Sequence, residues 1–135
     1  MSLDFVGPLS EKFELFFKGK QALYRHAFKR RHLRDREPTI LKEYARQVSR
    51  TLRPEQKIVF SPGTIPIAYL DCEQPIAFWT DATFGGMVGF YPQFSSLSNE
   101  CIRAGHAAEG SALRRARLAI YRPTGPQKVR SPTTA

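Results

Sequence analysis

The most regular alternation of apolar and polar residues lies between residues 38 and 53. Apolar side chains recur there every three or four positions: Ile40, Leu41, Tyr44, Ala45, Val48 and Leu52. This spacing places them along one face of an α-helix. Glu37-Pro38 opens the helix, because proline is tolerated in a first turn, and Arg53-Pro54 closes it. The pattern therefore predicts an amphipathic helix over residues 38–53.

A second helical pattern, over residues 11–33, combines aromatic and basic side chains. Its apolar members share helical spacing: Phe13, Phe16, Phe17, Leu23, Tyr24, Ala27 and Phe28. Gly19 lies among them, and glycine costs a helix interior about 1 kcal/mol relative to alanine. We therefore expect two helices that meet near Gly19. Residues 3–6, ended by Gly7-Pro8, are expected to form a short strand or an extended segment.

From residue 57 onward the pattern changes to short, continuous apolar runs, at residues 58–60, 75–80 and 118–121. Such runs are typical of parallel strands whose sheet is covered by helices on both faces. The segments between them, including a predicted helix over residues 96–117, are long enough for right-handed crossovers. We therefore expect an α/β, incomplete Rossmann-like three-layer domain over residues 1–121, with a short parallel sheet flanked by helices. Residues 122–135, with three prolines, are predicted to be a disordered tail.

Composition fits one globular domain: the chain has 135 residues, of which 41% are hydrophobic and 24% charged. No apolar run approaches the roughly 18 residues of a membrane-spanning helix, and the start of the chain does not resemble a secretory signal. We expect a cytoplasmic protein with reduced thiols at Cys72 and Cys101. Because His26, His32 and His106 lack metal-ligand spacing, we expect solvated or packed histidines, no metal and no cofactor.

The net charge of +9 comes from one segment. Residues 18–53 hold twelve Lys and Arg against three acidic residues, and the rest of the chain is balanced. The candidate membrane- or anion-binding residues are Lys18, Lys20, Arg25, Lys29, Arg30, Arg31 and Arg34. A basic aromatic helix suits an anionic membrane surface, and such cations also suit nucleic-acid phosphates. A third interpretation is a core-facing helix with a solvated basic back.

The candidate chemistry lies in two loops that follow predicted strands. Ligands of open α/β sheets bind beyond the carboxyl ends of the strands, and residues 61–64 and 81–86 occupy that position. The candidates are Asp81 as a catalytic residue, and Ser61, Gly63, Thr64, Thr83, Gly85 and Gly86 as substrate-binding residues. Asp81 could act on a proton or hydrogen-bond a hydroxyl; alternatively, it caps the following helix. The sequence has no GxGxxG, P-loop or GxSxG motif.

These segments also resemble a known family. The run from Lys57 to Leu70, the run from Pro75 to Met87 and Leu118-Ala-Ile-Tyr121 are similar to the N-terminal domain of retaining GT-B glycosyltransferases, family four. The most specific phrase is Phe78-Trp-Thr-Asp-Ala-Thr-Phe84. The resemblance implies a domain that holds a sugar or lipid-linked acceptor, without an obligatory metal. Asp81 falls at a cleft position where many relatives carry histidine.

Two hypotheses about function follow. The resemblance implies that this chain is a fragment of a glycosyltransferase acceptor domain, since relatives have a further βα unit before Leu3 and a donor domain after Tyr121. The nucleotide-sugar donor would bind that second domain, so we expect the chain alone to be inactive. The alternative is a non-enzymatic basic module that binds an anionic membrane surface or nucleic acid. The sequence contains no known nucleic-acid-binding motif, so we expect no specific nucleic-acid partner. The expected location of such a module is peripheral, at the inner face of the membrane.

Overall fold

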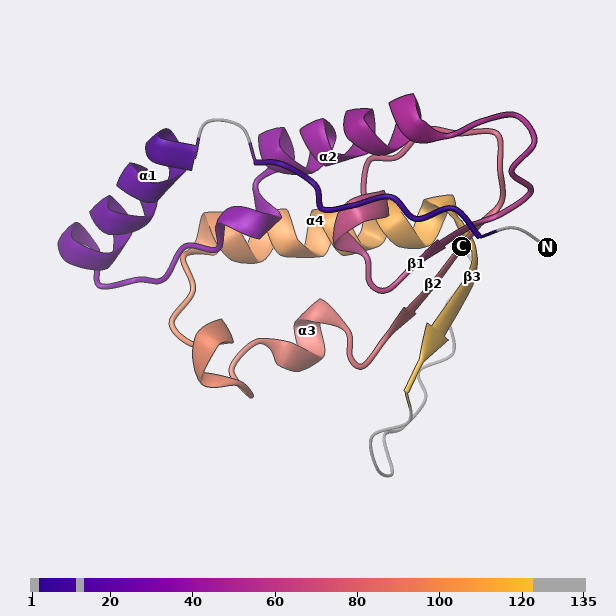
Figure 1. Cartoon of the computed structure of the whole chain (residues 1–135). Helices are drawn as coiled ribbons and strands as arrows, with labels where there is room; N and C mark the ends of the chain where they lie inside the picture. Colours follow the sequence, from indigo (N-terminus) through magenta and orange to yellow (C-terminus); the bar gives the residue numbers. More distant parts are fainter. Residues whose placement is uncertain (1–2, 12–13, 123–135) are drawn as a thin grey trace.

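The computed structural model describes residues 3–11 and 14–122, and we restrict the account to them. The chain runs through α1 (Glu14–Ala27), α2 (Pro38–Thr51), β1 (Val59–Ser61), β2 (Ile76–Thr80), α3 (Phe84–Met87), α4 (Asn99–Arg115) and β3 (Ala116–Tyr121), as Figure 1 shows. Three short 3-10 helices, at Arg34–Arg36, Ile65–Ile67 and Pro92–Phe94, lie between them. The predicted tail lies outside the described residues except for Arg122.

The sheet has three parallel strands in the order β1-β2-β3. In its register Ser61 pairs with Phe78, and Phe78 with Ala119. The predicted α/β class and the parallel sheet are therefore confirmed. The strands begin and end within two residues of the predicted runs, because the apolar runs that specify them are short and sharply bounded.

Both connections between the strands pack on the same face of the sheet. Ile67 and Leu70, from the first connection, and Ala112, from α4, share one core cluster with Ile76 and Phe78. The face of α2 that carries Ala45 and Val48 joins the same cluster. Strands that follow one another across a sheet in chain order, joined by crossovers of one hand, are expected to keep their connections on one face.

The opposite face of the sheet is exposed. Phe60, Trp79, Leu118 and Ile120 expose between 40% and 62% of their surface. The described residues thus form two layers, a sheet and a layer of helices, and the three-layer prediction is wrong for them. Apolar runs predicted strands buried on both faces, but the strand order decides where helices go, and the runs do not encode that order.

The two longer predicted helices are present with small differences in their bounds. α2 begins at Pro38 as expected and ends at Thr51, with Leu52 as its C-cap. α4 begins after Ser98, whose hydroxyl accepts a hydrogen bond from the Cys101 amide (3.2 Å). α1 runs through Gly19 without a break, so the predicted interruption is wrong. Residues 3–11 form no strand and run as an irregular segment.

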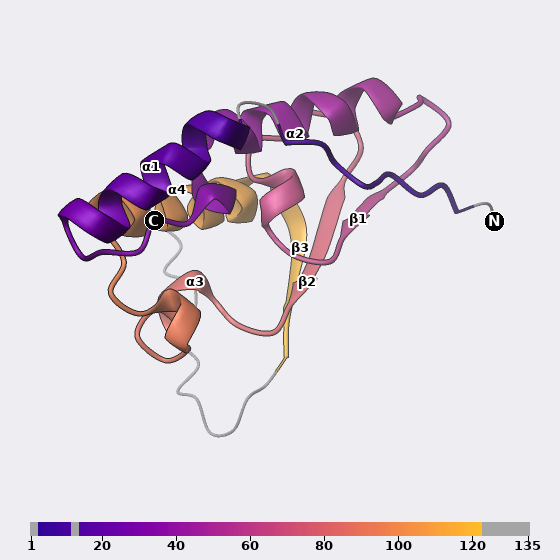
Figure 2. The same cartoon turned by 60° about the vertical axis from the view of Figure 1, so that its left-hand side comes forward.

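α1 lies at the end of the molecule away from the strands, as Figures 1 and 2 show from two directions. It packs against the 3-10 helix at Arg34–Arg36 and, through side chains described below, against the start of α4. The two surfaces discussed below, the outer face of α1 and the exposed face of the sheet, are therefore far apart.

Candidate functional site

The two loops singled out in the sequence leave the same edge of the sheet. β1 and β2 are parallel and in register, so residues 61–64 and 81–86 both follow carboxyl ends at that edge (Figure 1). This is the arrangement that a cleft between them requires.

The hydroxyl groups of these loops are engaged locally. Ser61 is buried, and its hydroxyl donates to the Gly63 carbonyl (2.8 Å). The Thr83 hydroxyl accepts from the Gly86 amide (3.0 Å) and caps α3. The N-cap of that helix is thus Thr83, not Asp81, which had been the alternative to a catalytic role. Asp81 is exposed and makes no ion pair or hydrogen bond within the described residues.

The remaining candidates in the two loops are Gly63, Thr64, Gly85 and Gly86. Gly63 has a φ of +127°, which an L-residue rarely adopts, so glycine is required by the turn itself. Thr64 precedes the 3-10 helix at Ile65–Ile67 without a side-chain capping bond. Gly85 and Gly86 are exposed in the single turn of α3. Turn geometry therefore accounts for the glycine at position 63.

Open α/β folds bind ligands in the crevice that forms where the strand order reverses. The described strands run β1-β2-β3 without such a reversal, so a ligand site at this edge would depend on the two loops alone. Two open pockets lie elsewhere. One, of about 380 Å³, is lined by residues of α1, the following turn and α4, and one of about 270 Å³ lies along α2. Neither is lined by the loop residues.

α1 is oriented opposite to the usual amphipathic helix of a globular domain. Leu15, Phe16 and Leu23 expose 86%, 67% and 56% of their surface, and Phe17 alone is buried. Apart from Phe17, the side chains that face the body of the protein are polar. Lys20 contacts Glu37, the N-cap of α2, and both Lys20 and Tyr24 contact Glu100 of α4. The interpretation of a core-facing helix with a solvated basic back is therefore wrong for α1.

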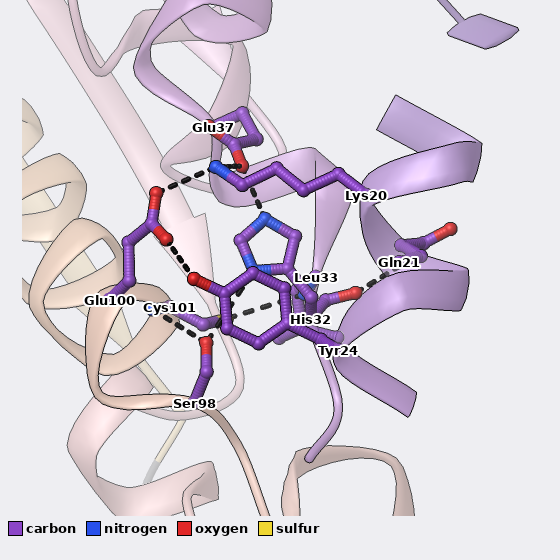
Figure 3. A network of polar contacts seen from close by, with 9 residues as sticks. All are labelled: Lys20, Gln21, Tyr24, His32, Leu33, Glu37, Ser98, Glu100 and Cys101. Atoms are coloured by element: carbon purple, nitrogen blue, oxygen red, sulfur yellow. Dashed lines mark hydrogen bonds and ion pairs between the residues drawn. The ribbon is translucent and has the colours of Figure 1, made fainter. Parts of the chain in front are cut away.

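A network of polar contacts holds the inner face of α1 (Figure 3). The Lys20 ammonium donates to Glu37 Oε1 (2.9 Å) and Glu100 Oε1 (2.6 Å), as the figure shows. The Tyr24 hydroxyl donates to the other oxygen of Glu100, and His32 Nε2 bonds Glu37. The rings of Tyr24 and His32 stack with centroids 5.0 Å apart. Three separate parts of the chain, near residues 20, 35 and 100, thus meet here.

The network explains how polar groups can lie at this interface. Glu37 and His32 are buried, and a buried charge is costly unless it is paired. Burial alone would lower the pKa of Lys20, but its hydrogen bonds to Glu100 and Glu37 outweigh this effect and raise that pKa. The hydrogen bond from Lys20, and then that from Tyr24, lowers the pKa of Glu100. The pairing favours the charged forms of Lys20 and Glu100 and holds α1 on the body of the protein.

The candidate anion-binding residues fall into two groups. Three are already paired: Lys20 in the network, Lys18 with Glu14, and Arg34 with Glu11. Arg25, Lys29, Arg30 and Arg31 are exposed and make no ion pair within the described residues. These four cations remain available to a ligand.

The turn after α1 gathers three of the available cations. Lys29 has a φ of +50°, which reverses the chain at the end of the helix. Arg31 then exchanges backbone hydrogen bonds with Ser96 and Ser98, which fixes the turn against the start of α4. Phe28, 62% exposed, stands in the same turn and lines the 380 Å³ pocket with Arg30.

Sequence reasoning missed the partners within the network. Glu100 lies 80 positions from Lys20, so no local pattern links them. The bond between His32 and Glu37 spans only five positions. The expectation of solvated or packed histidines is confirmed, since His32 is packed and His26 and His106 are exposed.

No group of histidine, cysteine and acidic residues in the described part of the chain could hold a metal ion. Cys72 and Cys101 are free thiols in separate core clusters. Among residues 3–11 and 14–122, no helix combines the length and apolar character needed to cross a bilayer. Comparisons with protein families, with curated proteins and with solved structures give no match.

Proposed function

We propose that this chain docks on an anionic membrane surface through α1 and the turn that follows it. The docking face consists of Leu15, Phe16, Leu23, Arg25, Phe28, Lys29, Arg30 and Arg31. The observation that supports the proposal best is the orientation of α1, which turns Leu15, Phe16 and Leu23 to solvent while Lys20 and Tyr24 contact the body of the protein.

The outward residues fit a helix that lies in the plane of the membrane interface. Such helices bury an apolar face among the lipid headgroups and place cations beside it. On α1, Leu15, Phe16 and Leu23 supply the apolar side, with Arg25 on the same helix. The turn adds Phe28 and three further cations. The anionic leaflet is the cytoplasmic one, so we assign the contact to the inner face of the membrane.

A membrane explains the docking face better than a nucleic acid does. Each exposed Lys or Arg near an anionic surface contributes about 1 kcal/mol to binding, and phosphate backbones attract the same cations. A phosphate backbone, however, gives no reason for exposed leucines. Leu15 and Leu23 are 86% and 56% exposed, which is unfavourable in water, whereas burial at a lipid interface would be favourable.

Vesicle flotation tests the proposal. We expect the chain to float with vesicles of phosphatidylcholine and phosphatidylserine at low salt, and much less with phosphatidylcholine alone. Lys29→Ala with Arg30→Ala should lower the partition coefficient at least tenfold, since two surface cations are lost. The matched control is Arg114→Ala with Arg117→Ala, which removes two exposed cations elsewhere and should change little.

The apolar part of the docking face is tested by a separate variant with its own control. Phe16→Ser should weaken vesicle binding about tenfold, because a buried Phe contributes about 1.5–3 kcal/mol. Phe90→Ser changes a side chain that is 76% exposed outside the docking face and should leave binding intact. Equal losses in both members of either pair would contradict the proposal, as would the absence of any binding at low salt.

A second candidate function, the glycosyltransferase acceptor domain, is favoured by one observation. The loops at residues 61–64 and 81–86 leave one edge of a parallel sheet, as an acceptor cleft requires. Titration with methyl α-glucoside and methyl α-mannoside, followed by amide NMR, tests this proposal. Shifts should be confined to the two loops and shrink in Asp81→Asn. Amide shifts confined to other residues, or no shifts, would contradict the acceptor-domain proposal. The chain alone should turn over no nucleotide sugar.

A further inference from the structure

The exposed face of the sheet is a continuous apolar surface. We call it the open face and define it by Ile58, Phe60, Ala77, Trp79, Leu118 and Ile120. The register places Phe60, Ala77 and Leu118 in one row across the strands, and Trp79 beside Ile120 in the next. All six residues are apolar, and the indole of Trp79 is the one hydrogen-bonding side chain among them; Arg117 is exposed next to Leu118, at the irregularity in the β2–β3 register.

This surface is unusual for a parallel sheet in water. Parallel sheets occur almost only where both faces are covered, yet Ile58, Phe60 and Leu118 each expose more than half of their surface. Contiguous apolar patches of this size mark contact surfaces. The open face therefore requires a covering layer in the folded, soluble protein.

We propose that a second copy of this chain covers the open face, so that two sheets pack face to face about a two-fold axis. Two-fold dimers are the commonest soluble assemblies, and their interface uses the same patch on both copies. Sheets that pack face to face bury their inner side chains between them. The inference does not depend on α1 or on the docking face.

Charge does not oppose a second copy at this surface. Two chains of net charge +9 repel each other, but the excess positive charge lies in residues 18–53. Residues 57–121 contain five basic and five acidic side chains. Because α1 lies at the end of the molecule away from the strands (Figures 1 and 2), sheet-to-sheet contact joins the balanced parts and keeps the basic docking faces apart.

Size also fits. Ala77, between Phe60 and Leu118 in the register, is itself only 6% exposed, so the large side chains around it supply the surface that a second copy would cover. The large residues of the open face expose on the order of 500 Å² per copy, and a specific interface needs about 1,000 Å² in total. The area thus meets the lower bound for a stable pair, and we expect a dissociation constant in the micromolar range.

The rest of this chain offers no better cover. Residues 123–135 contain Val129 as their single large apolar residue, which cannot replace five large side chains. Leu3 and Phe5 expose 90% and 93% of their surface, but they are two side chains against five. The apolar stripe of α1 is a further surface that could reach the open face, from a second copy. The experiment below separates this contact from the proposed one.

Trp79 provides the first readout, because it is the only tryptophan in the chain. As the concentration of the intact chain rises through the micromolar range, sedimentation should show a mass approaching twice 15.4 kDa. Over the same range, Trp79 emission should move to shorter wavelength, and acrylamide should quench it less. These measurements need no variant and are therefore unaffected by a failure to fold.

Two variants give the second readout. Phe60→Ser and Leu118→Ser should each raise the dissociation constant at least tenfold while the far-UV circular dichroism stays that of the native chain. Phe90→Ser, an exposed phenylalanine outside the open face, should dimerise normally. A monomer at all concentrations would overturn the proposal. So would a dimer whose Trp79 quenching does not change, or one that is lost in Leu23→Ser and kept in Phe60→Ser.

Discussion

Lys20 shows how strongly the role of a single side chain depends on residues far away in sequence. Its place in a basic segment predicted contact with external anions. In the structure its ammonium bonds Glu37 and Glu100 and is only 23% exposed. The basic residues could be identified from sequence, but their division into paired and available ones could not, because the pairing partner Glu100 lies in another helix.

The same network makes stability depend on pH through Glu100. Hydrogen bonds from Lys20 and Tyr24 hold the pKa of this carboxyl below its ordinary value. A depressed carboxyl pKa stabilises the fold above the unfolded pKa, about 4.3, and this contribution is lost as the pH falls through the folded value. The free energy of unfolding should therefore fall below about pH 5 more steeply in the wild type than in Glu100→Gln.

Urea unfolding at a series of pH values from 7 to 3 measures this difference. Lys20→Met should flatten the pH dependence in the same way as Glu100→Gln, since it removes the first of the two hydrogen-bond donors. A wild-type slope that persists in both variants would assign the pH dependence to other carboxyl groups.

Among the elements, α1 differs most from its sequence-based interpretation. Periodicity predicted that this segment is helical, but not which side of the helix packs against the rest of the protein. The apolar and the polar side are similar in size, and either could pack there. The polar side packs inward because Lys20 and Tyr24 find contacts there with His32, Glu37 and Glu100. Gly19 did not break the helix, since its cost of about 1 kcal/mol is small beside these contacts.

The packing of α3 on α4 depends on a glycine. Phe84, which begins α3, is almost fully buried and lies against Gly105 of α4. A β-carbon at Gly105 would overlap three carbons of the Phe84 ring. The ring is also held by Arg36, 5.2 Å from its centroid, and by the edge of His106, so it has little freedom to move.

Gly105→Ala should therefore destabilise the protein by about 1–3 kcal/mol, the usual cost of overpacking, although alanine is the better helix former. Gly110→Ala in the same helix is the control: its β-carbon would meet only the flexible end of Arg114 (3.3 Å), and a gain of up to about 1 kcal/mol is expected. Chemical denaturation of both variants measures the difference. Similar free energies of unfolding for the two would contradict the assigned packing.

At the scale of the whole molecule, sequence patterns predicted the α/β class, the three parallel strands and the shared edge of the two loops. They did not predict the two-layer architecture. Apolar runs such as residues 58–60 are equally compatible with strands covered by helices and strands covered by another sheet. Strand order, which is a property of tertiary packing, decides between these cases, and here it places α2, α4 and the first connection on one face.

The order β1-β2-β3 has one more consequence. Within the described residues β1 and β3 are the outer strands, and β3 is the longer at six residues. Its outward edge carries backbone donors and acceptors that no neighbour uses, and such edges accept an added strand. A further parallel strand could pair with this edge without disturbing any existing strand pair, so the sheet can lengthen while α1 and the polar network stay as they are.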